Sequence, residues 1–230
     1  MTFAELLPFA ILGGLLGLDV VSFPQAMISR PLVAATVAGA LAGDALAGFM
    51  VGALLELVAL GTLPFGASRY PEWGSASVAG GVMHVWLLRS GFAADGALVI
   101  AALVTLVTAW AGGITMVWLR KLNARWARRS LTALASGSGR AILRLQAAGL
   151  TADFLRGASL SMIAMATATL AAGVLRPGWN ADPQTSIALL LVVVGSVAVF
   201  ACWRLFNAVS RSAWLFGGGL ALGLLLIWAR

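Results

Sequence analysis

Four long stretches of this sequence contain no charged side chain, and each is long enough to cross a lipid bilayer. They are Gly96–Leu119, Gly157–Leu175, Pro183–Trp203 and Ser212–Ala229. A helix needs about 17–25 apolar residues to span the hydrocarbon core. Only 10% of the 230 residues are charged, against roughly 25% in soluble domains, so the chain is predicted to be an integral membrane protein. The runs lack period-two alternation, which favours helices over a barrel.

The first half of the chain is more broken than the second. Its apolar runs are shorter, at Leu6–Leu18, Pro31–Gly43, Ala45–Leu55 and Ser75–Leu88. A helix over Pro31–Gly43 covers only about 20 Å, short of the roughly 30 Å hydrocarbon core. Interrupted segments are tolerated where they are buried or line a cavity, and they point to a transporter's substrate site. The predicted fold is an all-α polytopic membrane helix bundle with broken or re-entrant segments in its N-terminal half.

Basic residues divide the chain into three predicted segments: a membrane half at 1–119, a basic connector at 120–148 and a second membrane half at 149–230. Eight of the 15 basic residues lie close together, at Arg120, Lys121, Arg125, Arg128, Arg129, Arg140, Arg144 and Arg156. The positive-inside rule places this region in the cytoplasm, beside anionic headgroups. That distribution argues against nucleic-acid binding. We expect a basic surface helix, a break at SGSG (136–139) and a second short helix.

The polar residues of the first half are the candidate site. Five of the eight acids lie at or before position 72, and an ionised group at membrane depth costs about 2.5–3.5 kcal/mol. Asp19 could cap a helix, pair with Arg30, or accept a hydroxyl from a polar ligand. Gln25 offers an amide donor and an acceptor, which suits sugar hydroxyls. Glu56 lies mid-helix among apolar residues, so it must find a partner or a cavity.

The sequence GASRYPEW at 66–73 carries a second group of candidates. Ser68, Arg69, Glu72 and Trp73 combine a hydroxyl, a guanidinium, a carboxylate and a large aromatic face. Hydrogen-bonding groups beside an apolar platform are what carbohydrate recognition needs, although a plain interfacial loop has the same composition. All eight candidates are predicted to contact a substrate.

The spacing of two acids predicts where this turn lies. Glu56 and Glu72 are 16 positions apart, which allows a half-helix and a return turn, but not a full crossing with a loop. We therefore expect Pro71–Trp73 to lie at membrane depth in a re-entrant turn near Asp19 and Glu56. Arg69 in such a turn would need a carboxylate partner.

Other residues have structural interpretations. Asp44 should cap a helix that begins at Ala45, and Pro31 suits a first helical turn. Small residues four apart should let helices approach closely: Gly13 and Gly17, Gly39 and Gly43, Gly48 and Gly52. His84 should be buried or hydrogen-bonded, and Cys202 alone forms no internal disulfide. The N-terminal MTFAE lacks a basic region, so no cleaved signal is expected.

The sequence lacks the motifs that are typical of catalytic, phosphate-binding and metal sites. It contains no phosphate-binding glycine loop with lysine, no nucleophile elbow and no paired metal ligands. We therefore predict no catalytic residue, no metal and no cofactor, and expect that the chain is not an enzyme by itself.

Four segments follow one another in a specific order and spacing: GLD (17–19), QAMISRPLV (25–33), G-x-x-x-GD (39–44) and GFMVGALLELVALGTLPFGA (48–67). In these segments the chain resembles a known family, the membrane IIC subunit of mannose/sorbose-type sugar phosphotransferase systems. A weaker match covers LRLQAAGLTADFLRG at 143–157. The family usually has a proline-aspartate pair after GA, where this chain has SRYPEWG with Pro71–Glu72.

The resemblance implies a sugar-translocating permease in the bacterial inner membrane. It implies a membrane partner, IID, and cytoplasmic phosphoryl carriers, IIB and IIA, with sugar phosphorylated as it is released inward. It also implies a homo- or hetero-oligomer and a sugar site lined by Asp19, Gln25, Arg30 and Glu56. Two alternatives stay open: a non-phosphorylating transporter subunit for another polar solute, such as a vitamin, and a non-transporting membrane scaffold on the same fold.

Overall fold

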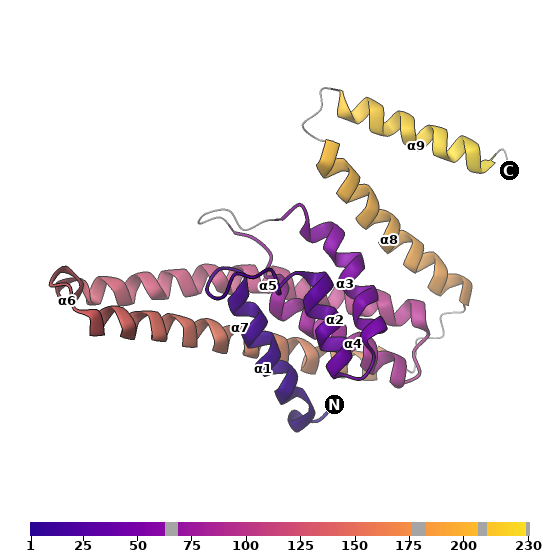
Figure 1. The fold of residues 1–230 in the computed structure, drawn as a ribbon. Coiled ribbons are helices and arrows are strands. Elements are labelled where there is room, and N and C mark those ends of the chain that lie inside the picture. Colours follow the sequence, from indigo (N-terminus) through magenta and orange to yellow (C-terminus); the bar gives the residue numbers. More distant parts are fainter. Residues whose placement is uncertain (63–68, 176–182, 207–210, 229–230) are drawn as a thin grey trace.

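The structure is a computed structural model that describes residues 1–62, 69–175, 183–206 and 211–228. Throughout these ranges the regular structure is helical. In chain order the helices are α1 (Phe3–Asp19), α2 (Pro31–Leu41), α3 (Ala45–Ala59), α4 (Trp73–Arg89), α5 (Ala94–Arg129), α6 (Leu131–Ala135), α7 (Gly139–Leu175), α8 (Pro183–Phe206) and α9 (Ser212–Trp228). Figure 1 shows α1 to α4 gathered against one end of a long pair formed by α5 and α7.

Helix α4 is the centre of the bundle. Of its 17 residues, 14 are buried, and it packs against α1, α2, α3, α5 and α7. Glycine, alanine and serine fill most of its first half, and such small residues let neighbouring backbones approach closely. His84 is buried, with Nδ1 2.8 Å from the carbonyl oxygen of Ala47 in α3. This confirms the buried, hydrogen-bonded role predicted for that histidine.

Helices α2 and α3 are short and form a hairpin. Their 11 and 15 residues reach only about 17 and 23 Å, less than the roughly 30 Å of a hydrocarbon core. Gly43 turns the chain between them with a φ of +94°. Asp44 then caps α3 by accepting a hydrogen bond of 2.9 Å from the N–H of Ala47. Both the short segments and this cap were predicted from the sequence.

Glycine contacts hold the α2–α3 hairpin together. A Cβ on Gly48 would lie 2.9 Å from the Cα of Gly39, and one on Gly52 would lie 2.9 Å from the Cα of Leu32. The two backbones are thus in direct contact, as predicted for the small residues in these helices. Gly43 has a different role from the predicted one, because its backbone conformation makes the turn.

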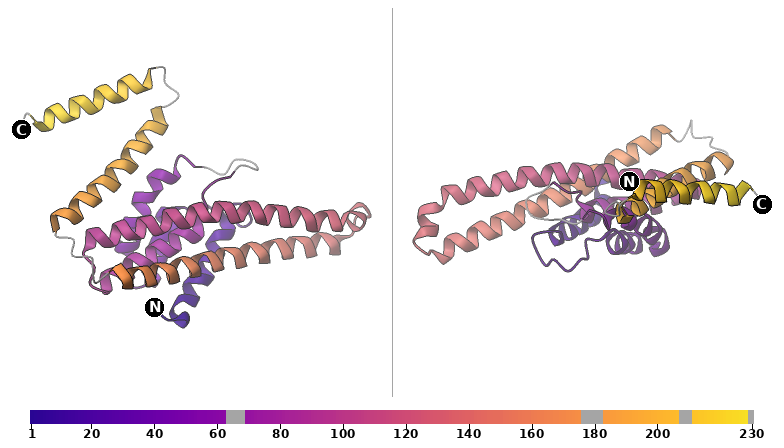
Figure 2. Two further views of the ribbon diagram at one scale, coloured as in Figure 1. Left: turned by 180° about the vertical axis from the view of Figure 1, so that it is seen from behind. Right: turned by 90° about the horizontal axis from the view of Figure 1, so that it is seen from above.

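Helices α5 and α7 are the two helices in the described residues that are long and apolar enough to cross a membrane. They contain 36 and 37 residues and project beyond the bundle as a hairpin with α6 at its tip (Figures 1 and 2). The predicted surface helix with a separate short helix is wrong. The basic residues instead continue α5 to Arg129 and begin α7 at Gly139, because Arg, Lys, Leu and Ala are strong helix formers. Only the break at SGSG remains.

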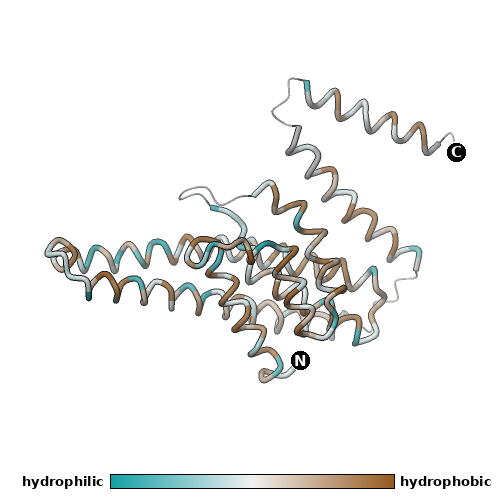
Figure 3. Tube along the Cα trace, in the orientation of Figure 1, coloured by the Kyte–Doolittle hydropathy of each residue, from teal (hydrophilic) through white to brown (hydrophobic). Residues whose placement is uncertain are grey.

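The remaining helices lie at the edge of the bundle. Helix α8 packs on α3 and α5, and α9 contacts α8, where Trp203 and Phe216 meet edge to face at 5.9 Å. Large apolar side chains are exposed on α1 to α3, on α5, on α7 and on α8–α9, and polar residues are frequent along the projecting part of the α5–α7 hairpin (Figure 3). A helix bundle that exposes apolar side chains in this way suits lipid on its outside.

Candidate functional site

A cavity of about 310 Å³ lies between the α1–α2 loop and the segment that leads into α4. Its size falls in the range of about 300–1,000 Å³ that is usual for ligand sites. The residues that line it are Asp19, Val20, Val21, Gln25, Met27, Ser29, Arg30, Thr62, Tyr70, Pro71 and Trp73. Four of the eight predicted site residues, Asp19, Gln25, Arg30 and Trp73, therefore meet at one cavity.

Asp19 holds the α1–α2 loop in place. It is the last residue of α1 and is buried. Its Oδ1 accepts a hydrogen bond of 2.6 Å from the N–H of Ala26, and its Oδ2 accepts one of 2.9 Å from the N–H of Ser29. Of the three roles that the sequence left open, the structure gives this carboxylate a capping role toward the loop that follows, at the edge of the cavity.

Arg30 and Glu56 form an ion pair between the start of α2 and the last turn of α3. The Nε of Arg30 donates to Glu56 Oε1 at 2.7 Å, and Glu56 Oε2 accepts from the N–H of Leu32 at 3.1 Å. Each side chain is 19% exposed. Glu56 thus has the partner that its apolar surroundings required. It does not line the cavity itself, but it orients the arginine that does.

Gln25 and Trp73 complete the polar and aromatic lining of the cavity. Gln25 adopts a left-handed backbone, with φ of 62°, and its side-chain amide donates to the carbonyl of Val21 at 2.8 Å. The indole N–H of Trp73 donates to Thr62 Oγ1 at 2.9 Å. Both side chains are therefore held in fixed orientations at the cavity. Tyr70, a further lining residue, accepts a hydrogen bond of 2.7 Å from Arg120 of α5.

Glu72 lies behind the cavity. Its side chain is fully buried and caps α4, because Oε1 accepts from the N–H of Ser75 at 3.1 Å. Its backbone N–H donates to the carbonyl of Ala109 at 2.9 Å, near the middle of the charge-free part of α5. The membrane depth predicted for this turn stays a prediction, and the bond to Ala109 agrees with it; the neighbours of Glu72, Pro71 and Trp73, line the cavity.

Arg69 is not among the residues that line the cavity. The guanidinium of Arg69 lies over the ring of Trp110, 5.3 Å from its centroid. Such cation–π contacts stabilise a charge that is partly removed from water, and they replace the carboxylate partner that the sequence predicted. Ser68 lies outside the described residues.

Sequence reasoning missed a polar cluster on α7. Arg156 Nε donates to Asp153 Oδ1 at 2.9 Å, and Arg156 Nη1 lies 3.9 Å from Glu72 Oε2. The second carboxylate oxygen of Asp153 accepts from the hydroxyl of Ser22 in the α1–α2 loop. The cluster thus ties that loop and the start of α4 to α7. The sequence signal was an aspartate and an arginine three residues apart, which share one helix face; Arg156 had been grouped with the basic connector.

Two serines join α1, α4 and α7 close to this cluster. Ser75 Oγ donates to the carbonyl of Gly13 at 3.0 Å, and Ser161 Oγ lies 3.0 Å from the carbonyl of Ser75. Among the described residues, no group of three or more His, Cys, Asp or Glu is placed to hold a metal ion. The cavity offers hydrogen-bonding groups and an aromatic wall.

A protein-family model identifies the family to which the sequence belongs. The model of the sorbose-specific IIC component of the phosphotransferase system matches residues 4–203. The chain belongs to this family. A curated relative, the sorbose-specific EIIC component of Klebsiella pneumoniae, is 38% identical over 92 residues, which are 39% of this chain and 34% of that protein. The chain thus matches only about a third of the length of that relative.

Two solved structures share the fold of this IIC chain. One, described as a membrane protein, matches with a TM-score of 0.68 and 20% identity, covering 98% of this chain and 86% of its own. The other is a cryo-EM structure of the mannose transporter ManYZ in complex with microcin E492. It matches with a TM-score of 0.60 and 21% identity over 97% of this chain and 87% of its own. At these identities the matches establish the fold only.

Family and fold confirm two predictions from the sequence. The resemblance to mannose/sorbose-type IIC subunits is confirmed over most of the chain, and so is the all-α membrane bundle with interrupted segments in its first half. Family and fold together make the chain a membrane-embedded member of the IIC family. The division at 119 and 148 stays a prediction; α5 and α7 run unbroken through both positions.

Proposed function

We propose that this IIC subunit binds a hexose-like sugar in the cavity between the α1–α2 loop and α4, and passes it to a cytoplasmic IIB protein that phosphorylates it. The observation that carries the proposal is the meeting of Asp19, Gln25, Arg30 and Trp73 at one cavity. These residues come from three separate stretches of sequence. The surrounding hydrogen bonds fix their side chains before any ligand arrives, which lowers the entropic cost of binding.

The chemistry of the cavity suits a polyol ring. Gln25 and Arg30 offer amide and guanidinium groups, and each oxygen of Asp19 has a further lone pair beyond the one that holds the loop. Trp73 and Pro71 supply the apolar surface on which the C–H face of a sugar ring can pack. A few placed polar groups on an otherwise apolar wall are typical of small-molecule sites.

Of the other four predicted residues, two position residues of the cavity and two are proposed to contact the sugar from the adjoining turn. Glu56 positions Arg30 through the ion pair. Glu72 positions Pro71 and Trp73 by capping α4. Ser68 and Arg69 are proposed to contact the sugar from the segment that leads to Tyr70. No residue of the chain is assigned a catalytic role, because phosphoryl transfer belongs to the carriers.

The proposal includes an assembly. The IIC subunit works as a multi-pass protein of the bacterial inner membrane, in a hetero-oligomer with a IID subunit, and receives IIB, which is charged by IIA. Exposed apolar surface on α2, α3 and α8 supports contact with lipid or with a second membrane subunit.

The test is uptake of radiolabelled hexoses by cells that lack their own sugar transporters and express this chain with its cognate IID, IIB and IIA. We expect one or a few hexoses to accumulate as sugar phosphates. Gln25→Ala and Arg30→Gln should each lower uptake by about tenfold or more, the effect of one lost hydrogen bond to a charged or polar partner. Gln184→Ala is the matched control, because Gln184 is exposed on α8.

Two outcomes would replace the proposal with an alternative. Accumulation of free, unphosphorylated solute without IIB would identify a transporter of the non-phosphorylating kind. Absence of uptake and of sugar binding by a well-folded complex would identify a scaffold.

A further inference from the structure

The tip of the α5–α7 hairpin carries a concentrated positive charge. We call residues 120–148 the basic hairpin; its charged residues are Arg120, Lys121, Arg125, Arg128, Arg129, Arg140 and Arg144. The sequence contains no acid from Gly96 to Ala152, so nothing within the hairpin neutralises them. The hairpin extends well away from the helices that surround the cavity (Figures 1 and 2).

The geometry of α5 places the tip beyond the lipid headgroups. The charge-free part of α5 ends at Leu119, and the helix continues unbroken for ten more residues to Arg129. Ten residues extend a helix by about 15 Å, whereas the headgroup region is only about 5–8 Å deep on each side. Lys121 and Arg125, at the base of the hairpin, can therefore contact anionic lipid headgroups, but the tip reaches into the aqueous phase.

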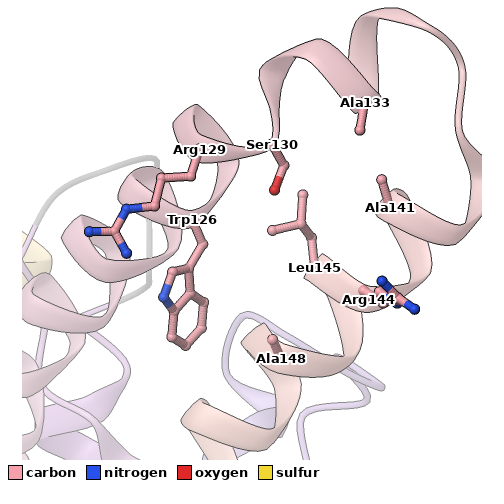
Figure 4. Close-up of a pocket in the computed structure, with 8 residues that line it drawn as sticks. All are labelled: Trp126, Arg129, Ser130, Ala133, Ala141, Arg144, Leu145 and Ala148. Atoms are coloured by element: carbon pink, nitrogen blue, oxygen red, sulfur yellow. The ribbon is translucent and has the colours of Figure 1, made fainter.

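A cavity of about 490 Å³ opens between the two arms of the hairpin at this tip. Trp126, Leu145 and Ala148 contribute apolar surface to it, and Arg129 and Arg144 line it from opposite arms. Figure 4 shows Leu145 directed toward Ser130 across the gap, with the two guanidinium groups extending outward on opposite sides. All three of Arg128, Arg129 and Arg144 are exposed.

We propose that this tip is the docking site of a soluble protein that has an acidic face around an apolar side chain. The apolar side chain enters the cavity against Trp126 and Leu145, and the acidic groups meet the arginines on either side. Tryptophan and arginine are the residues that most often dominate protein interfaces. A site with only charge would suit a lipid surface equally, but a flat headgroup layer has nothing to fill a cavity between two helices.

The partner is the cytoplasmic phosphoryl carrier, an assignment that rests on the proposed function. Helix α5 connects the docking site directly to the sugar cavity, because Arg120 at the base of the hairpin donates a hydrogen bond to Tyr70 in the cavity wall. The positive charge of the hairpin indicates the cytoplasmic side, so a carrier bound at the tip would lie on the side of the membrane to which the sugar is released.

The experiment compares two variants that remove equal charge from the two ends of the hairpin. The tip variant is Arg129→Gln with Arg144→Gln, and the base variant is Lys121→Gln with Arg125→Gln; all four side chains are exposed. The complex with IID is placed in nanodiscs of neutral phosphatidylcholine, and binding of purified cognate IIB is measured by interferometry. We expect the tip variant to bind IIB about five- to thirty-fold more weakly, and the base variant to change by less than about threefold.

Two further measurements separate docking by charge from docking by shape. Binding to the unaltered complex should weaken as salt is raised from low to physiological ionic strength, because exposed charges are screened. Trp126→Ala should weaken IIB binding without changing the charge of the hairpin.

Failure of this inference differs from failure of the proposed function. Equal IIB binding by the tip variant, or no IIB binding by an unaltered complex that binds sugar, would overturn the docking site. The docking site would also be overturned if the base variant lost more IIB binding than the tip variant, and did so only with anionic phosphatidylglycerol, since that result would assign the charge to lipid. A change in the number of subunits in the tip variant would overturn it as well. Loss of sugar binding in the unaltered complex, with IIB docking retained, would count against the sugar site alone.

Discussion

Arg156 on α7 and Glu72 at the start of α4 face each other inside the bundle, with Nη1 3.9 Å from Oε2. The Glu72 side chain is fully buried and that of Arg156 is 8% exposed. Arg156 is held more tightly by Asp153, at 2.9 Å from Nε, so its contact with Glu72 is the looser of the two. One guanidinium therefore balances two buried carboxylates that belong to different halves of the chain.

Removing this guanidinium should destabilise the protein strongly. Arg156→Gln leaves Asp153 and Glu72 buried without a cation, and an unpaired buried charge costs about 3–5 kcal/mol. Thermal unfolding of the purified complex should show a clearly lower midpoint. Arg128→Gln, which removes the same charge from the exposed hairpin, should leave the midpoint unchanged. Equal midpoints for the two variants would mean that water reaches the Asp153–Glu72 cluster.

Asp19 should matter for the shape of the cavity. Both carboxylate oxygens accept backbone N–H groups of the α1–α2 loop, and Asp19→Asn replaces one acceptor with a donor that faces a donor. We expect a loss of about 1–3 kcal/mol, faster hydrogen exchange in residues 20–30, and weaker sugar binding. Hydrogen exchange followed by mass spectrometry measures the second effect directly.

Asp44 provides the control for that substitution. It caps α3 through a single hydrogen bond to Ala47, and asparagine is as good an N-cap as aspartate. Asp44→Asn should therefore leave stability and sugar binding almost unchanged. If residues 20–30 exchange hydrogen as slowly in Asp19→Asn as in Asp44→Asn, the loop does not depend on the Asp19 carboxylate.

Glu56 should affect sugar binding only through Arg30. Glu56→Gln removes the ion pair but keeps an acceptor for the N–H of Leu32, so we expect a loss of stability of about 1–2 kcal/mol. It should weaken sugar binding in the natural background, because Arg30 loses its orientation. In an Arg30→Gln background the same substitution should add little, since its target is already gone.

A double-mutant cycle on sugar affinity decides this point. A coupling of about 0.5–3 kcal/mol between Glu56→Gln and Arg30→Gln is the size found for residues in direct contact. Additive effects would instead indicate that Glu56 contacts the sugar itself, which was the hypothesis from sequence alone.

Helix positions were predictable because their causes are local. Charge-free runs, the proline of α2, the Asp44 cap and the small residues of α3 act over a few residues, and the structure places helices where these signals occur. The helix arrangement within the basic connector was predicted wrongly, because the prediction relied on charge rather than on helix propensity. Positive charge indicates the side of the membrane, but it carries no information on whether a helix continues past the headgroups.

The site was predictable only in part, because its members are joined over long distances in sequence. The family segments indicated Asp19, Gln25 and Arg30, and composition indicated Trp73, all of which line the cavity. That Glu56 serves Arg30, and that Glu72 faces Arg156, depends on the packing of α2 on α3 and of α4 on α7. Residue type alone does not reveal such pairings.

The close approach of α2 and α3 gives the last prediction, a pair of glycine substitutions with opposite effects. A methyl group at Gly48 would lie 2.9 Å from the Cα of Gly39 and closer still to the carbonyl oxygen of Ala35. Backbone atoms cannot move aside as flexible side chains can, so Gly48→Ala should separate α2 from α3 and cost about 1–3 kcal/mol. Gly173→Ala meets no atom within 4 Å and should instead stabilise α7 by up to about 1 kcal/mol, the difference in helix propensity. Thermal unfolding of the two purified variants should move the midpoint in opposite directions; a Gly48→Ala midpoint at or above the unaltered one would show that the hairpin is packed more loosely than these contacts require.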